Sequence, residues 1–324
     1  MPIHDIAIIG GGPAGLTAAV YALRAQLDVA LIARSMGGKV TYPFSLRDME
    51  VVDPVWGADL VFQFESMVED SAASIINANV VDINRTDDEI FEVILNDGEV
   101  ILARTVIFNT GARAKRMYVH GELEYRGRGV SFSAVSHSPF FHGKDVAVIG
   151  GGQRAIVAAL ELLPLASQVY LIAPLLHGLA EVPTAKELLQ HPNISVFQGW
   201  EIQQVIGDTI EVDGEEEPGY VTGINLVGAN GETRFLPVEG IFVQYELMPH
   251  NDIVRGLVDL DHYGFVIINE RCETSLPGFF AAGDVTSVHA EQVPVAIGEG
   301  GKAALSAWEY LATHAAPTTV LDKK

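Results

Sequence analysis

The sequence contains a single cysteine, Cys272, among its 324 residues. One cysteine cannot form a disulfide within its own chain, so a redox-active or structural cysteine pair is excluded. An intermolecular disulfide and a lone reactive thiol stay open as alternatives, but a small, buried, apolar side chain is the simplest interpretation of Cys272. Any activity that needs two thiols from this chain is therefore ruled out.

Basic residues are also scarce, with 20 Lys and Arg against 42 Asp and Glu, and the formal net charge is −22. Nucleic-acid binding relies on contacts from Lys and Arg to phosphate, so we expect no nucleic-acid partner. A solvated acidic surface is the simplest interpretation, and salt adaptation of the host or docking to a basic partner are the alternatives. The run at residues 213–217 fits an exposed hairpin tip.

Long apolar runs are missing as well. No stretch approaches the ~18 consecutive apolar residues of a membrane span. The first apolar run, residues 6–9, has no basic segment before it, which argues against a signal peptide. We therefore expect a soluble protein with a cytoplasmic location and no membrane span.

Glycine, in contrast, is abundant at 32 residues, and it marks a pattern that occurs twice. An apolar run leads into a glycine-rich turn, then into an apolar helical stretch and a second apolar run. This order predicts a strand–turn–helix–strand unit in each half of the chain. The runs before the turns are residues 5–9 and 145–149, the turns are 10–15 and 150–155, and the later runs are 29–32 and 169–172.

The turn residues suit a dinucleotide. In such a turn the first glycine permits the tight bend, the second lets the backbone approach a pyrophosphate, and the third position allows close packing of helix on strand. Gly10, Gly12 and Gly15 fill these positions in the first turn, and Gly150, Gly152 and Ala155 fill them in the second. The pyrophosphate would then lie at the positive end of the helix. A tight turn without a nucleotide is the alternative for each copy.

The remaining pattern is rich in strands. We expect a hairpin of residues 91–95 and 100–102 around the turn Asn96-Asp97-Gly98. Further expected elements are a buried strand at 106–111, a hairpin of 210–212 with 221–227, a strand and turn at 278–284, and a helix at 295–311 whose glycines suggest a close neighbour; residues 315–324 should fray.

Taken together, these segments resemble the low-molecular-weight thioredoxin reductase branch of the pyridine-nucleotide-disulfide oxidoreductases, over about residues 5–312. The motifs that carry the resemblance are the two glycine turns, Thr110-Gly111-Ala112, and residues 281–285. The resemblance implies an α/β fold of two nested Rossmann-like dinucleotide-binding domains. The FAD domain, residues 1–113 and 244–324, would be split by an inserted NAD(P)-binding-like domain, residues 114–243. It also implies FAD as cofactor and a homodimer.

The resemblance also assigns site residues. The glycines of the first turn would cradle the FAD pyrophosphate, and Asp284 would bond the ribityl or pyrophosphate region, with a turn-capping Asp as the alternative. Gln292 and Val293 would present backbone N–H groups to the flavin. The full expected cofactor set is Gly10, Gly12, Pro13, Ala14, Gly15, Gly38, Lys39, Thr110, Gly111, Gly283, Asp284, Gln292 and Val293.

The sequence departs from its relatives at the redox centre. Ser133 and Ser136 stand where the relatives carry Cys-x-x-Cys, and His137 stands where they carry an acidic Asp. A hydroxyl forms neither a disulfide nor a thiolate adduct, so direct disulfide reduction is nearly excluded. His137 could still deliver protons, and these three residues are the candidate catalytic set. A polar loop connecting the domains is the alternative.

The second nucleotide site departs too, so NAD(P)H binding stays uncertain. Where NADPH-binding relatives carry a His-Arg-Arg run, this chain reads Ala173-Pro174-Leu175-Leu176, which has no cation for a phosphate and no acid for a ribose. Arg154 could substitute for the missing cations or obstruct the site. Tyr245 and Glu246 replace residues near the nucleotide and suggest an altered or closed site. The residues of this doubtful site are Gly150, Gly152, Gln153 and Arg154; no metal site is predicted.

Three functions fit these observations. The first is an FAD oxidoreductase that passes electrons without a dithiol, to or from a ferredoxin-like or flavodoxin-like partner. The second is an NAD(P)H-dependent flavin oxidase or diaphorase. The third is a non-catalytic, regulatory flavin-binding protein whose second nucleotide site is degenerate.

Overall fold

The computed structural model describes residues 2–47, 57–174, 185–212, 214–287 and 291–314. The chain divides into two compact units, the first made of Met1–Thr41, Trp56–Arg113 and Met248–Lys324, the second of Tyr42–Val55 and Ala114–Leu247. Compared with the expected domain ranges, the second unit also takes residues 42–55 and 244–247. Each unit contains one parallel strand–turn–helix–strand core, so the expected α/β fold of Rossmann-like type is confirmed.

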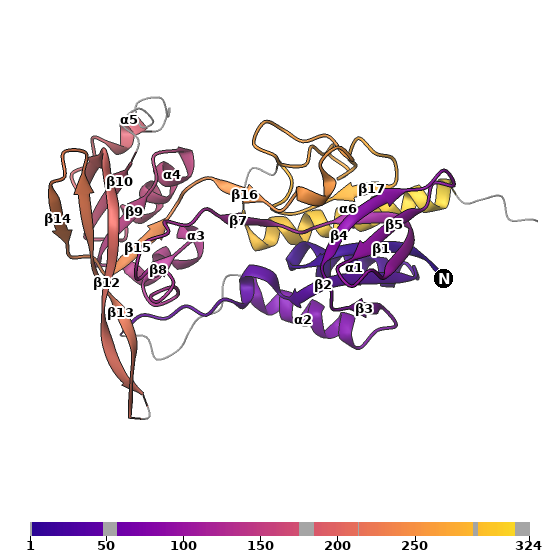
Figure 1. The fold of residues 1–324 in the computed structure, drawn as a ribbon, viewed down its shortest axis with the longest axis horizontal. Helices are drawn as coiled ribbons and strands as arrows, with labels where there is room; N and C mark the ends of the chain where they lie inside the picture. The colour runs from indigo at the N-terminus through magenta and orange to yellow at the C-terminus, as the bar shows by residue number, and fades with distance from the viewer. Residues whose placement is uncertain (1, 48–56, 175–184, 213, 288–290, 315–324) are drawn as a thin grey trace, which may run out of the picture. The chain divides into compact units, whose positions relative to one another are not determined.

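The first unit is built on a sheet of order β3-β2-β1-β6-β5-β4, with β17 also paired to β6 (Figure 1). The pairs among β1, β2, β3, β6 and β17 are parallel, whereas β4 and β5 join antiparallel. The strands are β1 (Ile3–Gly11), β2 (Val29–Met36), β3 (Ser74–Ile76), β4 (Val80–Arg85), β5 (Phe91–Leu95), β6 (Val100–Phe108) and β17 (Phe279–Ala281).

Strand β6 corrects one expectation. We predicted a hairpin strand at 100–102 and a separate buried strand at 106–111, but a single strand runs from Val100 to Phe108. The polar residues between them belong to the strand, because Thr105 donates its hydroxyl to the Asp5 carbonyl at 2.8 Å and Arg104 pairs with the Asp5 carboxylate. The first half of β6 pairs with β5 and the second half with β17.

The helices of the first unit are α1 (Pro13–Arg24), α2 (Ala58–Glu69) and α6 (Val293–Thr313), with 3-10 turns η1 (Gly38–Thr41) and η4 (Asp252–Val254). Helix α6 confirms the predicted helix and extends it at both ends. It lies against α1, and the approach is close: a Cβ on Gly300 would lie 2.0 Å from the Ala14 carbonyl oxygen. The Cβ position of Gly298, two residues earlier, has no described atom within 4 Å. The expected close neighbour is therefore present at Gly300 but not at Gly298.

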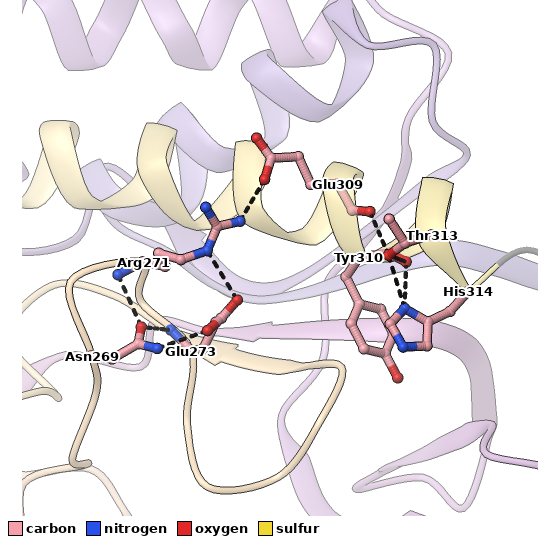
Figure 2. A network of polar contacts seen from close by, with 7 residues as sticks. All are labelled: Asn269, Arg271, Glu273, Glu309, Tyr310, Thr313 and His314. Carbon is pink, nitrogen blue, oxygen red and sulfur yellow. Dashed lines mark hydrogen bonds and ion pairs between the residues drawn. The ribbon is translucent and has the colours of Figure 1, made fainter.

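A polar network fastens the loop at Asn269–Glu273 to α6 (Figure 2). The Arg271 guanidinium donates to Glu273 at 3.1 Å and to Glu309 of α6 at 2.5 Å. Cys272 lies inside this loop, fully buried, with a left-handed φ of 61°. Burial raises the pKa of its thiol to about 11, so the expected inert, buried cysteine is confirmed.

The second unit holds a parallel sheet of order β11-β10-β9-β15-β8 and an antiparallel sheet of order β12-β13-β14. Its predicted hairpin is far longer than expected, since β12 and β13 pair from Trp200 to Gly228. The strands are β8 (Val130–Ser131), β9 (Asp145–Ile149), β10 (Gln168–Ala173), β11 (Ile194–Gln198), β12 (Trp200–Val212), β13 (Glu215–Gly228), β14 (Thr233–Leu236) and β15 (Gly240–Val243).

The helices of the second unit are α3 (Ala134–His137), α4 (Gln153–Leu162) and α5 (Ala185–Leu188), with the 3-10 turn η2 (Ser138–Phe141). Strands β7 (Ala112–Ala114) and β16 (Leu247–Pro249), where the chain passes between the units, pair with each other. Within the described ranges, no helix is long and apolar enough to cross a membrane.

Candidate functional site

The first glycine turn joins β1 to α1, and a Cβ would meet different surroundings at each of its three motif glycines. Gly10 has a φ of +117°, and a Cβ there would lie 2.4 Å from the Asn109 carbonyl oxygen. A Cβ on Gly15 would lie 1.8 Å from the Gly10 carbonyl oxygen, so α1 can approach β1 only without one. Gly12 differs from both, because no atom of the described residues lies within 4 Å of its Cβ position. The open side of the turn is therefore at Gly12.

Two further segments lie close to this turn. Gly38 has a φ of +61°, and its Cβ position is 3.1 Å from the Gly12 Cα. The next residue, Lys39, places its ammonium 2.7 Å from the Asp284 carboxylate and 3.7 Å from Glu291. The fold thus brings Gly12, Gly38, Lys39 and Asp284 together from three distant segments.

The turn that carries Asp284 is held by a residue that the sequence analysis missed. The Gly283 backbone N–H donates to the Glu299 carboxylate of α6 at 2.9 Å, and Thr286 donates its hydroxyl to the Gly283 carbonyl at 2.8 Å. Burial raises the pKa of Glu299, with a smaller rise from nearby Asp284, against the lowering effect of the Gly283 bond. Nothing in the sequence around Glu299 indicated this bond, because Gly283 lies in a different segment of the chain.

Thr110 and Gly111 connect the end of β6 to the returning chain. The Thr110 hydroxyl donates to the His250 carbonyl at 2.7 Å, and the His250 N–H donates to the Gly111 carbonyl at 2.9 Å. Gly111 has a φ of +70°, which suits glycine.

Gln292 is the N-cap of α6 without a side-chain cap, and Val293 is the first helical residue. The start of α6 therefore carries backbone N–H groups that the helix itself does not satisfy.

These residues fit FAD. Helix α1 begins at Pro13, its N-cap Gly12 contributes no side chain, and the space beside Gly12 is open. An anionic pyrophosphate suits the positive end of such a helix. Asn109 adds a buried Oδ1 with no hydrogen-bond partner among the described residues, beneath the turn. Gly12, Ala14 and Gly15 would hold the pyrophosphate, with Lys39 and Asp284 beside it.

The second glycine turn, between β9 and α4, is shaped differently. Gly150 has a φ of +143°, and its Cβ position is 2.6 Å from the Gln244 carbonyl oxygen, so the bend itself is retained. At Gly152, however, a Cβ would lie 2.5 Å from Oε1 of Glu246. The Arg154 guanidinium donates to the carbonyl of Tyr245. The turn predicted for a second nucleotide therefore lies against the chain's own Tyr245–Glu246 segment. Gln153 opens α4 beside it, whereas Leu175 and Leu176 lie outside the described residues.

Ser133 and Ser136 contact each other at the start of α3. The Ser133 hydroxyl donates to the Ser136 hydroxyl at 3.0 Å. Ser133 also caps α3, because its Oγ accepts the Ser136 backbone N–H at 3.3 Å. Both hydroxyls are thus engaged with each other and with the start of a short helix.

His137 packs within the same unit. Its ring stacks on Phe44, with centroids 3.9 Å apart and an angle of 11° between the planes. Nδ1 lies 2.7 Å from the Ser131 hydroxyl, and Nε2 is buried without a hydrogen-bond partner among the described residues. Burial lowers the pKa of His137 to about 4, so the imidazole is neutral near pH 7. This geometry favours a packing role for His137 over proton delivery.

Replacing both serines by cysteine should restore a disulfide. The two Oγ atoms already lie 3.0 Å apart, and sulfur atoms at these positions need only close to about 2.0 Å. After oxidation, the Ser133→Cys/Ser136→Cys variant should show one free thiol in denaturant, that of Cys272, and three after reduction. The Ser133→Cys variant alone is the control and should show two thiols in both states. Three thiols in the oxidised double variant would contradict the placement.

Comparison with known proteins identifies the family. The sequence matches the pyridine nucleotide-disulphide oxidoreductase family over residues 4–300. The chain belongs to this family. It is 37% identical, over 97% of its length, to a component of alkyl hydroperoxide reductase from Pseudomonas putida, and 34% identical, over 95%, to an NADH dehydrogenase of Bacillus subtilis. The chain spans 59% and 58% of the length of these two relatives.

Solved structures agree with this assignment. The fold matches thioredoxin reductase from Streptococcus pyogenes with a TM-score of 0.83 at 28% identity, over 96% of this chain and 99% of that one. Thioredoxin reductase from Giardia duodenalis matches with the same TM-score and identity, over 96% and 100%. The family and these relatives carry the names of oxidoreductases, in agreement with the predicted enzyme class.

Proposed function

We propose that this protein is an FAD-dependent oxidoreductase that transfers electrons without a redox dithiol of its own. The observation that carries the proposal is the hydrogen bond between Ser133 and Ser136. The resemblance assigns a cysteine pair to these two positions. Hydroxyls of ordinary acidity do not exchange with disulfides, so this pair is a helix cap and not a redox centre.

The first glycine turn supports the flavin half of the proposal. Gly12 leaves the turn open, Gly15 lets α1 pack against β1, and Glu299 fixes the Gly283–Asp284 turn beside them. FAD, when bound, supplies the group that accepts and gives up electrons. The chain's own contribution is to bind it, to orient it, and to place the start of α6 near it.

We infer that the electron donor is a reduced ferredoxin or flavodoxin. The support is the arrangement of the second glycine turn, where Glu246 and Tyr245 lie where a nicotinamide nucleotide would be expected to approach. A flavin without a nearby dithiol or a nucleotide must exchange electrons directly with a partner.

The test is anaerobic mixing of the FAD-loaded protein with reduced ferredoxin, reduced flavodoxin, NADH or NADPH, while the flavin absorbance is followed. One of the two protein donors should bleach the flavin. The reduced protein should then fail to reduce oxidised thioredoxin. Failure of every donor, or sustained thioredoxin reduction, would overturn the proposal.

A second candidate is an NADH-dependent flavin oxidase or diaphorase. Its support is the relative from Bacillus subtilis named NADH dehydrogenase, at 34% identity. Rapid bleaching by NADH, followed by turnover with oxygen or a quinone, would favour this candidate over a ferredoxin-linked enzyme. Both candidates share a flavin without a dithiol.

A further inference from the structure

We propose that Glu246 is a built-in anion that closes the second glycine turn to the pyrophosphate of a dinucleotide. In a strand–turn–helix unit of this kind, a pyrophosphate lies over the second glycine at the positive end of the helix. Here that glycine is Gly152, the N-cap of α4, and a Cβ on it would lie 2.5 Å from Oε1 of Glu246. A carboxylate oxygen therefore occupies the space that the missing side chain leaves.

The backbone that carries Glu246 is fixed on both sides. The Gln244 N–H donates to the Ile149 carbonyl at 2.8 Å, and the Lys115 N–H donates to the Glu246 carbonyl at 3.4 Å. Between them, the Tyr245 ring packs against the core of the unit, and burial raises the pKa of its phenol. The Arg154 guanidinium, from the first turn of α4, donates to the Tyr245 carbonyl. These contacts hold the backbone of residues 244–246 in place, so that a change at this position would have to come from the Glu246 side chain.

The first turn provides the internal comparison. Gly12 and Gly152 are both N-caps with extended backbone, at φ −77° and −95°, and neither contributes a side chain. None of the residues that the structure describes comes within 4 Å of the Gly12 Cβ position, whereas the Gly152 Cβ position lies beside a carboxylate. A negative charge is favourable at a helix N-terminus, so Glu246 would be stabilised there and would repel a second anion. Glu246 thus determines specificity by exclusion.

The test measures nucleotide binding and does not depend on electron transfer. FAD-loaded wild type, Glu246→Gly and Glu246→Gln are titrated with NADH and with redox-inactive ADP-ribose by calorimetry. Wild type should not saturate below millimolar ligand, and Glu246→Gly should bind both ligands about tenfold more tightly or better. Glu246→Gln, which keeps the bulk but loses the charge, should gain less. If Glu246→Gly does not fold, the nucleotide affinity of Glu246→Gln tests whether the charge of Glu246 excludes the pyrophosphate.

Glu232→Gln is the matched control, because Glu232 is an exposed carboxylate in a turn of the same unit and its loss changes the net charge equally. It should leave both affinities unchanged. Micromolar binding of either ligand to wild type would overturn the proposal, as would Glu246 variants that bind no better than wild type. Either result would leave the absence of a dithiol untouched. Micromolar binding of NADH to wild type would also remove the support for a protein electron donor and favour the NADH-dependent candidate.

Discussion

A Gly12→Val substitution should deprive the protein of FAD while the polypeptide still folds. Gly12 has an extended backbone that any residue adopts, and within the described part of the chain a Cβ there meets no atom within 4 Å. The valine side chain would instead fill the space that a pyrophosphate needs. We expect FAD affinity to fall about a hundredfold or more, which corresponds to about 2.7 kcal/mol. The ratio of flavin to protein absorbance after purification and a titration of apoprotein with FAD measure this change.

Gly152→Val is the control for Gly12→Val, since it changes the same N-cap position in the second turn. Valine is a poorer N-cap than glycine, so each variant should lose roughly 1 kcal/mol of stability in its apo form. Gly152→Val should lose more than Gly12→Val, because its Cβ would lie 2.5 Å from Oε1 of Glu246 and must displace that carboxylate. Only Gly12→Val should lose the flavin. A Gly12→Val protein that retains one FAD per chain would show that the pyrophosphate does not lie at this turn.

The second large effect concerns the packing of α6 on α1. Gly300→Ala should destabilise the protein by about 3 kcal/mol or more, because the new Cβ would lie 2.0 Å from the Ala14 carbonyl oxygen and two helix backbones must separate. Gly298→Ala, in the same helix, should stabilise by about 1 kcal/mol, because that glycine meets nothing within 4 Å and alanine is the better helix former. The midpoints of urea unfolding measure both.

Gly300→Ala is expected to lower the stability and Gly298→Ala to raise it, and this difference in sign tests the packing of α6 on α1. A helix in which both substitutions stabilise would mean that α6 does not approach α1 at Gly300. Because Ala14 follows the first glycine turn, Gly300→Ala should also weaken FAD binding, whereas Gly298→Ala should not. The flavin content of the two purified variants checks this second effect.

The two parallel cores could be predicted from the sequence because the residues that define each of them lie close together in the chain. Each buried apolar run, glycine turn and helix follows within a short stretch, as at β9, Gly150–Gly152 and α4. The Asn96-Asp97-Gly98 turn likewise fixed the hairpin of β5 with β6. The continuity of β6 was missed, because Arg104 and Thr105 look like a polar break until their bonds to Asp5 are known.

Contacts between distant segments were beyond the sequence. Glu246 was recognised as an unusual residue, but its carboxylate beside Gly152 depends on how β15 ends next to β9. Glu299 gave no pattern of its own, and its bond to Gly283 appears only once α6 is placed. His137 was a candidate proton donor until the stacked Phe44 ring showed how far it is buried.

Strand β17 has a consequence for the order in which the protein assembles. It pairs with the second half of β6, and Phe279, Ala281 and Val285 complete the apolar core that β1 and β6 begin. A ribosome makes these residues only after both segments of the second unit, residues 42–55 and 114–247, have been synthesised. Contacts so far apart in the chain form slowly, and domains fold as units during synthesis. The second unit can therefore fold first, while the flavin-binding sheet waits for its last parallel strand.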